Sequence, residues 1–221
     1  MLAQIVLFDG FDPLDVIGPY EVFMAGGLVT DGAITAELVS AEGPREVPSG
    51  LGGVVLRAAA RLDPATADVV VVPGAVGRLS DQTEDDPADD SIPVILGRTL
   101  ETGLPSLLKD ALDRPGLTVA SVCGGSLVLA MAGLIEGRPA TTHHLGMDLL
   151  EATGVTPVDA RIVDDGDLVT AANVTSGLDL GLYLLEREIG PRVAVAVQKL
   201  FAHERRGTVW YATGPTPTIG A

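Results

Sequence analysis

Four consecutive valines, Val69 to Val72, restrict the fold of this chain more than any other feature. They lie in ADVVVVPGA at residues 67–75, where a Pro-Gly pair ends the apolar run. An unbroken row of β-branched residues favours a strand buried on both faces, which is typical of the centre of a parallel sheet. The run AQIVLFDG at residues 3–10 has the same character and ends in Asp-Gly. We therefore expect a parallel sheet with these two strands inside it.

Segments with helix-like spacing of apolar residues alternate with further strand-like runs. The expected helices are FDPLDVIGPYEVFMAGG (11–27), ILGRTLETGLPSLLKDALDRPG (95–116), SLVLAMAGLIEG (126–137), MDLLEATG (147–154) and a final helical region at 176–203. The expected further strands are ITAELVSA (34–41), VVLRA (54–58), LTVASVC (117–123) and a pair within ARIVDDGDLVTAANV (160–174). This order predicts an α/β fold with a doubly wound, mostly parallel sheet and helices on both faces. A chain of 221 residues suffices for one such domain, which we expect to span 1–221.

Charge and cysteine content exclude several classes of protein. Fourteen basic and thirty acidic residues give a net charge of −16, which repels nucleic acid and anionic membrane surfaces. The single cysteine permits no intrachain disulfide, and MLAQIVLFDG lacks the basic and apolar regions of a secretory signal. No apolar run is long enough to cross a bilayer. We expect a cytoplasmic protein that binds neither nucleic acid nor membrane.

The segment SDQTEDDPADDS has six acidic residues and no apolar periodicity. These features predict a solvated surface loop. Nothing fixes the spacing of its carboxylates, so we assign no metal site to it.

The one thiol, Cys123, lies in ASVCGGS, between a strand-like run and a helix-like run. A side chain at such a corner leaves the carboxyl end of the sheet, where open α/β proteins bind ligands, and the helix N-terminus there favours thiolate over thiol. The N–H of Gly124 would be available to a developing oxyanion. The pattern resembles a nucleophile elbow with cysteine in place of serine. The alternative is a small buried cysteine beside glycines that only permit tight packing.

Two kinds of side chain are candidate partners of the thiol. His143 lies twenty residues after Cys123 in TTHH, at the expected end of the next strand, and could reach the same sheet edge; otherwise His143 and His144 form a structural pair. Adjacent residues on an extended segment point in opposite directions, so the two histidines make a poor metal site. Asp15 lies among apolar residues, which raises a carboxyl pKa and allows it to donate a hydrogen bond to a thiolate. Otherwise Asp15 is an exposed capping residue, although Asp12 beside Pro13 is the better cap.

Four segments together resemble the DJ-1/PfpI (ThiJ/PfpI) superfamily, and most of all its isocyanide-hydratase-like branch. They are FDGFDPLDVIGPYEVF, VVVPGA, ASVCGGSLVLAMAGLIEGRPATTHH and NVTSGLDLGLYLLE, which follow the family order over most of the chain. The resemblance implies a flavodoxin-like fold of the class I glutamine amidotransferase type, a homodimer, and a reactive cysteine that needs no cofactor.

The resemblance also implies roles for individual residues. Cys123 becomes the nucleophile and Asp15 the acid hydrogen-bonded to it. The backbone at Gly74, Ala75 and Gly124 becomes the set of oxyanion or substrate donors. His143 matches a histidine that lies near the cysteine in some members.

The chain departs from the family pattern at two places. Resembling hydratases have threonine after the nucleophile and peptidase-like members have histidine, where this chain has Gly124. The segment at 77–102 also looks longer than in the hydratases, and we expect an acidic surface insertion there that covers or reshapes the pocket.

The resemblance implies a hydratase or hydrolase of a small electrophile, with an isocyanide converted to an N-substituted formamide as the leading case. One alternative is a glyoxalase or amidase activity of the same nucleophile. The other is a non-catalytic thiol sensor of redox state or ligand, as in the amidase-like domains of AraC-type regulators. Those regulators carry a helix-turn-helix domain after this fold, for which we expect no room before Ala221.

Overall fold

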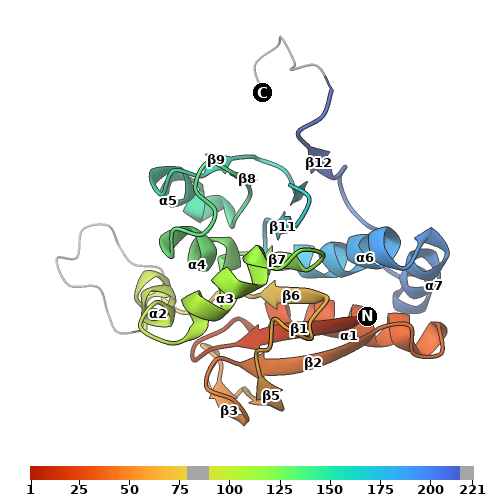
Figure 1. The fold of residues 1–221 in the computed structure, drawn as a ribbon, viewed down its shortest axis with the longest axis horizontal. Coiled ribbons are helices and arrows are strands. Elements are labelled where there is room, and N and C mark those ends of the chain that lie inside the picture. The colour runs from red at the N-terminus through yellow and green to blue at the C-terminus, as the bar shows by residue number, and fades with distance from the viewer. Residues whose placement is uncertain (79–89, 215–221) are drawn as a thin grey trace.

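The computed structural model describes residues 1–78 and 90–214, which form an α/β fold around an eight-stranded sheet (Figure 1). The strand order is β12-β10-β11-β7-β6-β1-β2-β5, and every neighbouring pair is parallel except β10 with β11. The strands are β1 Leu2–Leu7, β2 Thr35–Ser40, β5 Ala60–Arg61, β6 Val69–Val72, β7 Thr118–Val122, β10 Ile162–Asp164, β11 Leu168–Ala171 and β12 Trp210–Tyr211. The predicted mostly parallel, flavodoxin-like sheet is confirmed.

The four valines form β6, which is buried along its whole length between β1 and β7. Its register pairs Val71 with Ile5 on one side and with Ala120 on the other. Because both neighbours are parallel, the three strands end at the same edge of the sheet. The loops after β1, β6 and β7 therefore meet there.

Helices cover both faces of the sheet, as the alternation of segments predicts (Figure 1). Helices α1, α6 and α7 pack on one another and form one group. In a second group, α4 is contacted by both α2 and α5. The helices are α1 Pro13–Val29, α2 Ile92–Thr99, α3 Leu104–Asp113, α4 Gly125–Met131, α5 Met147–Ala152, α6 Ser176–Glu188 and α7 Pro191–Phe201. A 3₁₀ turn covers His144–Gly146, and two small sheets pair β3 Arg45–Pro48 with β4 Val55–Ala58 and β8 Pro139–Ala140 with β9 Thr156–Pro157.

Three expected elements differ from the structure. The helix expected at 126–137 ends at Met131, because Gly133 takes a left-handed φ of 71° and closes the last turn on Ala130. The helix expected at 95–116 is two helices, α2 and α3, separated by a turn at residues 100–103. The strand expected before the two histidines is the two-residue β8, which lies outside the main sheet.

The segment at 77–102, where an acidic surface insertion is expected, is described only in part. Residues 79–89, which hold most of its carboxylates, lie outside the described residues. The remainder forms α2, whose Ile95 and Leu96 are 7% and 1% exposed. Their apolar side chains contribute to the core, while Pro93 and Arg98 of the same helix are exposed. Within the described residues, no helix is long and apolar enough to cross a membrane.

Candidate functional site

Cys123 occupies a strained corner between β7 and α4. Its φ is 55°, a left-handed conformation that costs a non-glycine residue about 1–2 kcal/mol. Three hydrogen bonds hold the corner: the Cys123 N–H donates to the Ala171 carbonyl at 2.9 Å, and the Cys123 carbonyl accepts from Thr142 Oγ1 at 2.9 Å and Ser126 Oγ at 3.4 Å. This geometry is that of a nucleophile elbow.

The two glycines after the thiol have different reasons to be glycine. A Cβ on Gly125 would lie 2.0 Å from the Val72 carbonyl oxygen, so only glycine lets α4 pack this closely on the end of β6. A Cβ on Gly124 would meet no atom closer than 3.5 Å, and its φ of −70° suits any residue. The packing explanation for the Gly-Gly pair therefore holds for Gly125 only.

Asp15 reaches the thiol from the first turn of α1. Asp12 caps this helix through the Leu14 N–H at 2.9 Å, as expected, and one turn later Asp15 is fully buried. Its Oδ2 accepts the Gly74 N–H at 2.9 Å, whereas Oδ1 is buried with no hydrogen-bond partner among the described residues. Asp15 and Cys123 lie close enough to shift each other's pKa. The structure thus brings together the acid and the thiol that the sequence singled out.

The surroundings of the pair favour its neutral form. Burial raises the pKa of Asp15 well above its ordinary value, and the charge of Asp12 raises it further, against the hydrogen bonds from Gly74 and Cys123. Burial also raises the pKa of Cys123, as does the charge of Asp15, while the Gly124 N–H lowers it. Burial thus opposes the thiolate that the helix N-terminus is expected to favour. Both shifts are in the direction of the protonated form.

The three expected backbone donors have separate roles. The Gly74 N–H is already bonded to Asp15, so it positions the acid. The Gly124 N–H interacts with the thiol. Within the described residues the Ala75 N–H has no hydrogen-bond partner, because its neighbours Gly74 and Val76 make the bridge to the β1–α1 loop instead. Ala75 is the donor left for a substrate.

His143 is not bonded to the thiol in the structure. Its Nδ1 accepts from the Leu145 N–H at 3.3 Å, and its ring stacks at 4.3 Å from that of His144, which in turn contacts Asn173. Burial, and then the neighbouring His144, lower the pKa of His143. The contact that this segment makes with the elbow comes from Thr142, which the sequence did not single out.

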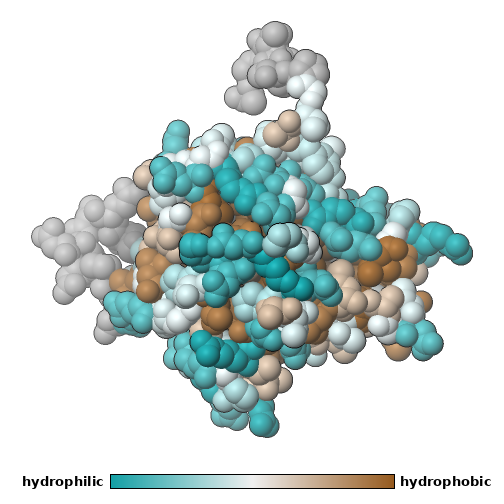
Figure 2. All heavy atoms as spheres, viewed as in Figure 1, coloured by the Kyte–Doolittle hydropathy of each residue, from teal (hydrophilic) through white to brown (hydrophobic). Residues whose placement is uncertain are grey.

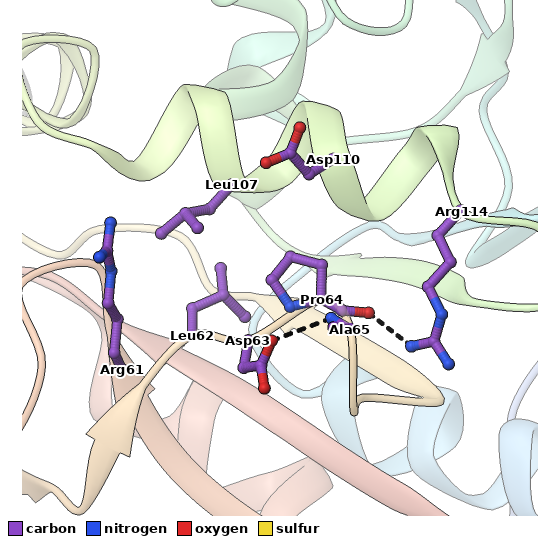
Figure 3. A pocket seen from close by; sticks show the side chains of 8 residues that line it. All are labelled: Arg61, Leu62, Asp63, Pro64, Ala65, Leu107, Asp110 and Arg114. Carbon is purple, nitrogen blue, oxygen red and sulfur yellow. Dashed lines mark hydrogen bonds between the residues drawn. The ribbon is translucent and has the colours of Figure 1, made fainter.

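Two hollows of about 720 Å³ lie away from the elbow. Figure 3 shows the first, where Arg61 and Arg114 stand on either side of a floor that includes Leu62 and Pro64. It lies between the loop that leads into β6 and the helix that precedes β7, hence at the amino ends of strands whose carboxyl ends carry the thiol. The second lies between α6 and residues 204–211. Neither is lined by a nucleophile, and the described part of the chain has no group of three or more side chains suited to a metal ion.

Comparisons with known proteins show the family of the chain. A model of the DJ-1/PfpI family matches residues 97–187. Isonitrile hydratase of Pseudomonas putida is 33% identical over 193 residues, which are 87% of this chain and 74% of that protein. The HTH-type transcriptional regulator CdhR of Pseudomonas aeruginosa is 39% identical over 92 residues, 41% of this chain and only 27% of the regulator.

Solved structures share the fold at lower identity. A ThiJ/PfpI family protein from Pseudomonas syringae superposes with a TM-score of 0.73 at 24% identity, over 100% of this chain and 78% of that one. Drosophila melanogaster DJ-1beta superposes with a TM-score of 0.72 at 21% identity, over 92% and 98% of the two chains. These structures support the fold but carry no activity to this chain.

Proposed function

Because the chain belongs to the DJ-1/PfpI family, we propose that it is a cofactor-independent hydratase whose nucleophile is Cys123, with an isocyanide as the leading substrate. The observation that carries this proposal is the buried pair of Asp15 and Cys123, in which the carboxyl oxygen Oδ1 has no other described partner. The similarity to isonitrile hydratase over most of both chains supports the choice of substrate.

A neutral acid beside a neutral thiol suits addition across the terminal carbon of an isocyanide. The sulfur of Cys123 forms a bond to that carbon while the carbon gains a proton from the pair, which gives a thioimidate, R–N=CH–S–Cys. Asp15 passes this proton and recovers one from the thiol, so no net charge is created in the dry site.

Water completes the reaction. It adds to the thioimidate carbon, the carbon–sulfur bond breaks, and the sulfur recovers its proton, which releases R–NH–CHO and free Cys123. Asp15, held by the Gly74 N–H, is placed to move the proton in this step as well. The free Ala75 N–H is the donor that would stabilise the oxygen of the tetrahedral intermediate.

A ligand or redox sensor is the second candidate, and the match to part of a transcriptional regulator favours it. A sensor that works by oxidation needs an accessible thiolate. Here burial raises the pKa of Cys123, which counts against a sensor that works by oxidation. A glyoxalase or amidase activity would use the same thiol and is distinguished by the choice of substrate.

The test measures turnover of p-nitrophenyl isocyanide and methylglyoxal by the wild type and four variants. Cys123→Ser and Cys123→Ala should lose at least about 10³-fold in kcat, and Asp15→Asn about 10²-fold, because they remove the nucleophile and the proton carrier. His143→Ala should change kcat by less than about threefold, since His143 has no hydrogen bond to the thiol. All variants should keep the thermal melting profile of a folded domain.

Two results would contradict the proposal. One is turnover that survives in Cys123→Ser, and the other is a wild type that converts no electrophile of the panel. Formation of lactate from methylglyoxal without conversion of the isocyanide would reassign the substrate to the α-oxoaldehydes.

A further inference from the structure

A leucine from α2 occupies the space beside the residue that follows the nucleophile. A Cβ on Gly124 would lie 3.5 Å from Leu96 Cδ1, 3.6 Å from Gly74 Cα and 3.9 Å from the Ala75 nitrogen. The same point is thus bordered by an apolar side chain and by the turn that carries the free N–H of Ala75. Leu96 therefore borders the space beside Gly124, whose N–H interacts with the thiol.

The backbone gives no reason for glycine at position 124. Its φ and ψ are −70° and 0°, and a methyl group there would make only ordinary contacts. The γ atoms of a larger side chain extend about 1.5 Å further, which brings a branched side chain against Leu96. Gly124 and Leu96 thus form a complementary pair, in which the Leu96 side chain from α2 packs where a larger side chain at position 124 would extend.

Leu96 is held rigidly enough to act as a wall. It is 1% exposed, and its neighbour Ile95 fills the notch between two glycines of the site loops. A Cβ on Gly10 would lie 2.5 Å from Ile95 Cγ2, and one on Gly77 would lie 2.9 Å from Ile95 Cδ1. The Ile92 N–H also bonds to the Arg78 carbonyl at 3.1 Å, which ties the start of α2 to the loop after β6.

We propose that Leu96 is the specificity-determining residue of the Cys123 site, which restricts it to small electrophiles with a compact apolar substituent. An apolar wall beside Gly124, the residue after the thiol, accepts a short aliphatic group and offers no hydrogen bond to hydroxylated or charged substituents. The substrate class rests on the proposed function, whereas the position of the wall rests on the geometry alone. Leu96 acts by shape and takes no part in proton transfer.

Alkylation of the thiol tests the wall without assuming a substrate. Cys123 is the only cysteine of the chain, so the rate of labelling by maleimides reports on this site alone. N-methylmaleimide and N-cyclohexylmaleimide share one chemistry and differ in bulk. Leu96→Ala should raise the ratio of the cyclohexyl rate to the methyl rate at least about tenfold, because the truncation opens the space beside Gly124. Leu96→Val, a smaller truncation, should raise it less.

The matched control is Leu117→Ala, a truncation of a leucine 2% exposed that lies just before β7, at the other end of the strand. It should leave the ratio of the two rates unchanged while lowering the melting temperature to a similar extent. Leu96→Met, which keeps the volume, should behave like the wild type.

Substitutions at Gly124 test the pairing with Leu96. Gly124→Thr should slow labelling at least about tenfold, and by less than about threefold when Leu96→Ala is also present. An equal effect of Gly124→Thr in both backgrounds, or an unchanged ratio of maleimide rates in Leu96→Ala and Leu96→Val, overturns the inference.

Isocyanides then separate this inference from the proposed function. The ratio of kcat/KM for cyclohexyl isocyanide over methyl isocyanide should rise about tenfold in Leu96→Ala. A change in maleimide selectivity without any isocyanide turnover leaves the wall in place and refutes the substrate. Isocyanide turnover with unchanged selectivity in both assays refutes the wall and keeps the proposed function.

Discussion

The residue on which the chemistry depends most is Asp15, because its environment decides where the protons of the site reside. The carboxyl group is fully buried, bonded once to the Gly74 N–H, and near the charge of Asp12. All its neighbours except Gly74 and Cys123 favour the protonated form. An acid of this kind stays neutral at a pH at which exposed carboxyl groups are ionised.

The raised pKa of Asp15 predicts that its replacement by asparagine stabilises the fold as the pH rises. A carboxyl whose pKa is higher in the folded than in the unfolded state binds more protons when folded, so its contribution is full below about pH 3.9 and is lost as the pH rises towards the folded pKa. Between these two pKa values, the free energy of unfolding of Asp15→Asn minus that of the wild type should rise with pH, by up to about 1.4 kcal/mol per pH unit. Urea unfolding from pH 4 to pH 7 measures this difference.

Asp148→Asn, at an exposed position in the first turn of α5, is the control and should follow the wild type across this range. A difference between Asp15→Asn and wild type that does not vary with pH would show that Asp15 is ionised in the folded protein. The proposed reaction, which relies on a protonated Asp15, would then be wrong.

The sequence identifies some site residues and misses others for physical reasons. Cys123 and Asp15 were found because a lone thiol on a glycine corner and an acid among apolar residues are locally unusual. Thr142 was missed, because its bond to the Cys123 carbonyl depends on the placement of a segment that follows β8 outside the main sheet. Leu96 was missed because it follows an acidic run, and nothing local indicates that it packs over Gly124.

At the scale of elements, most strands and helices follow from their patterns, and the exceptions are set by tertiary contacts. The valine run gives β6, and Asp165-Gly166 gives the antiparallel turn between β10 and β11. The early end of α4 depends on Gly133, a glycine inside an apolar pattern that reads as helix. Local periodicity does not show where such a glycine adopts a left-handed conformation.

The space around two helical glycines, one in α4 and one in α2, predicts opposite effects on stability when each is replaced by alanine. Gly125→Ala should destabilise the protein by about 3 kcal/mol or more, because its Cβ would lie 2.0 Å from the Val72 carbonyl oxygen and the backbone must shift. Gly97→Ala, within α2 and with no atom near the added Cβ, should stabilise it by about 0.5–1 kcal/mol. Urea unfolding measures both, and a Gly125→Ala variant as stable as the wild type would contradict the close approach of α4 to β6.

At the scale of the molecule, one face of the helix α1 exposes a row of large apolar side chains to solvent. Leu14, Ile17, Met24 and Leu28 follow one face of α1 and are 36–79% exposed, although the other faces of this helix are buried. Figure 2 shows apolar atoms at the end of the molecule where α7 lies, where Val195 and Leu200 are exposed. Apolar stripes of this extent mark surfaces that associate.

The homodimer expected from the family resemblance stays a prediction, and α1 is where we expect its interface. Two copies with a net charge of −16 each repel one another, so an interface between them should be mostly apolar. The stripe on α1 is apolar except for the exposed Glu21. Wild type should therefore elute in light scattering with the mass of two chains of 22.7 kDa, and Met24→Glu with Leu28→Glu with that of one. Leu51→Glu with Leu149→Glu, at similarly exposed leucines elsewhere, should stay dimeric. A monomeric wild type would contradict the homodimer, and a dimer that survives the charges on α1 would place its interface elsewhere.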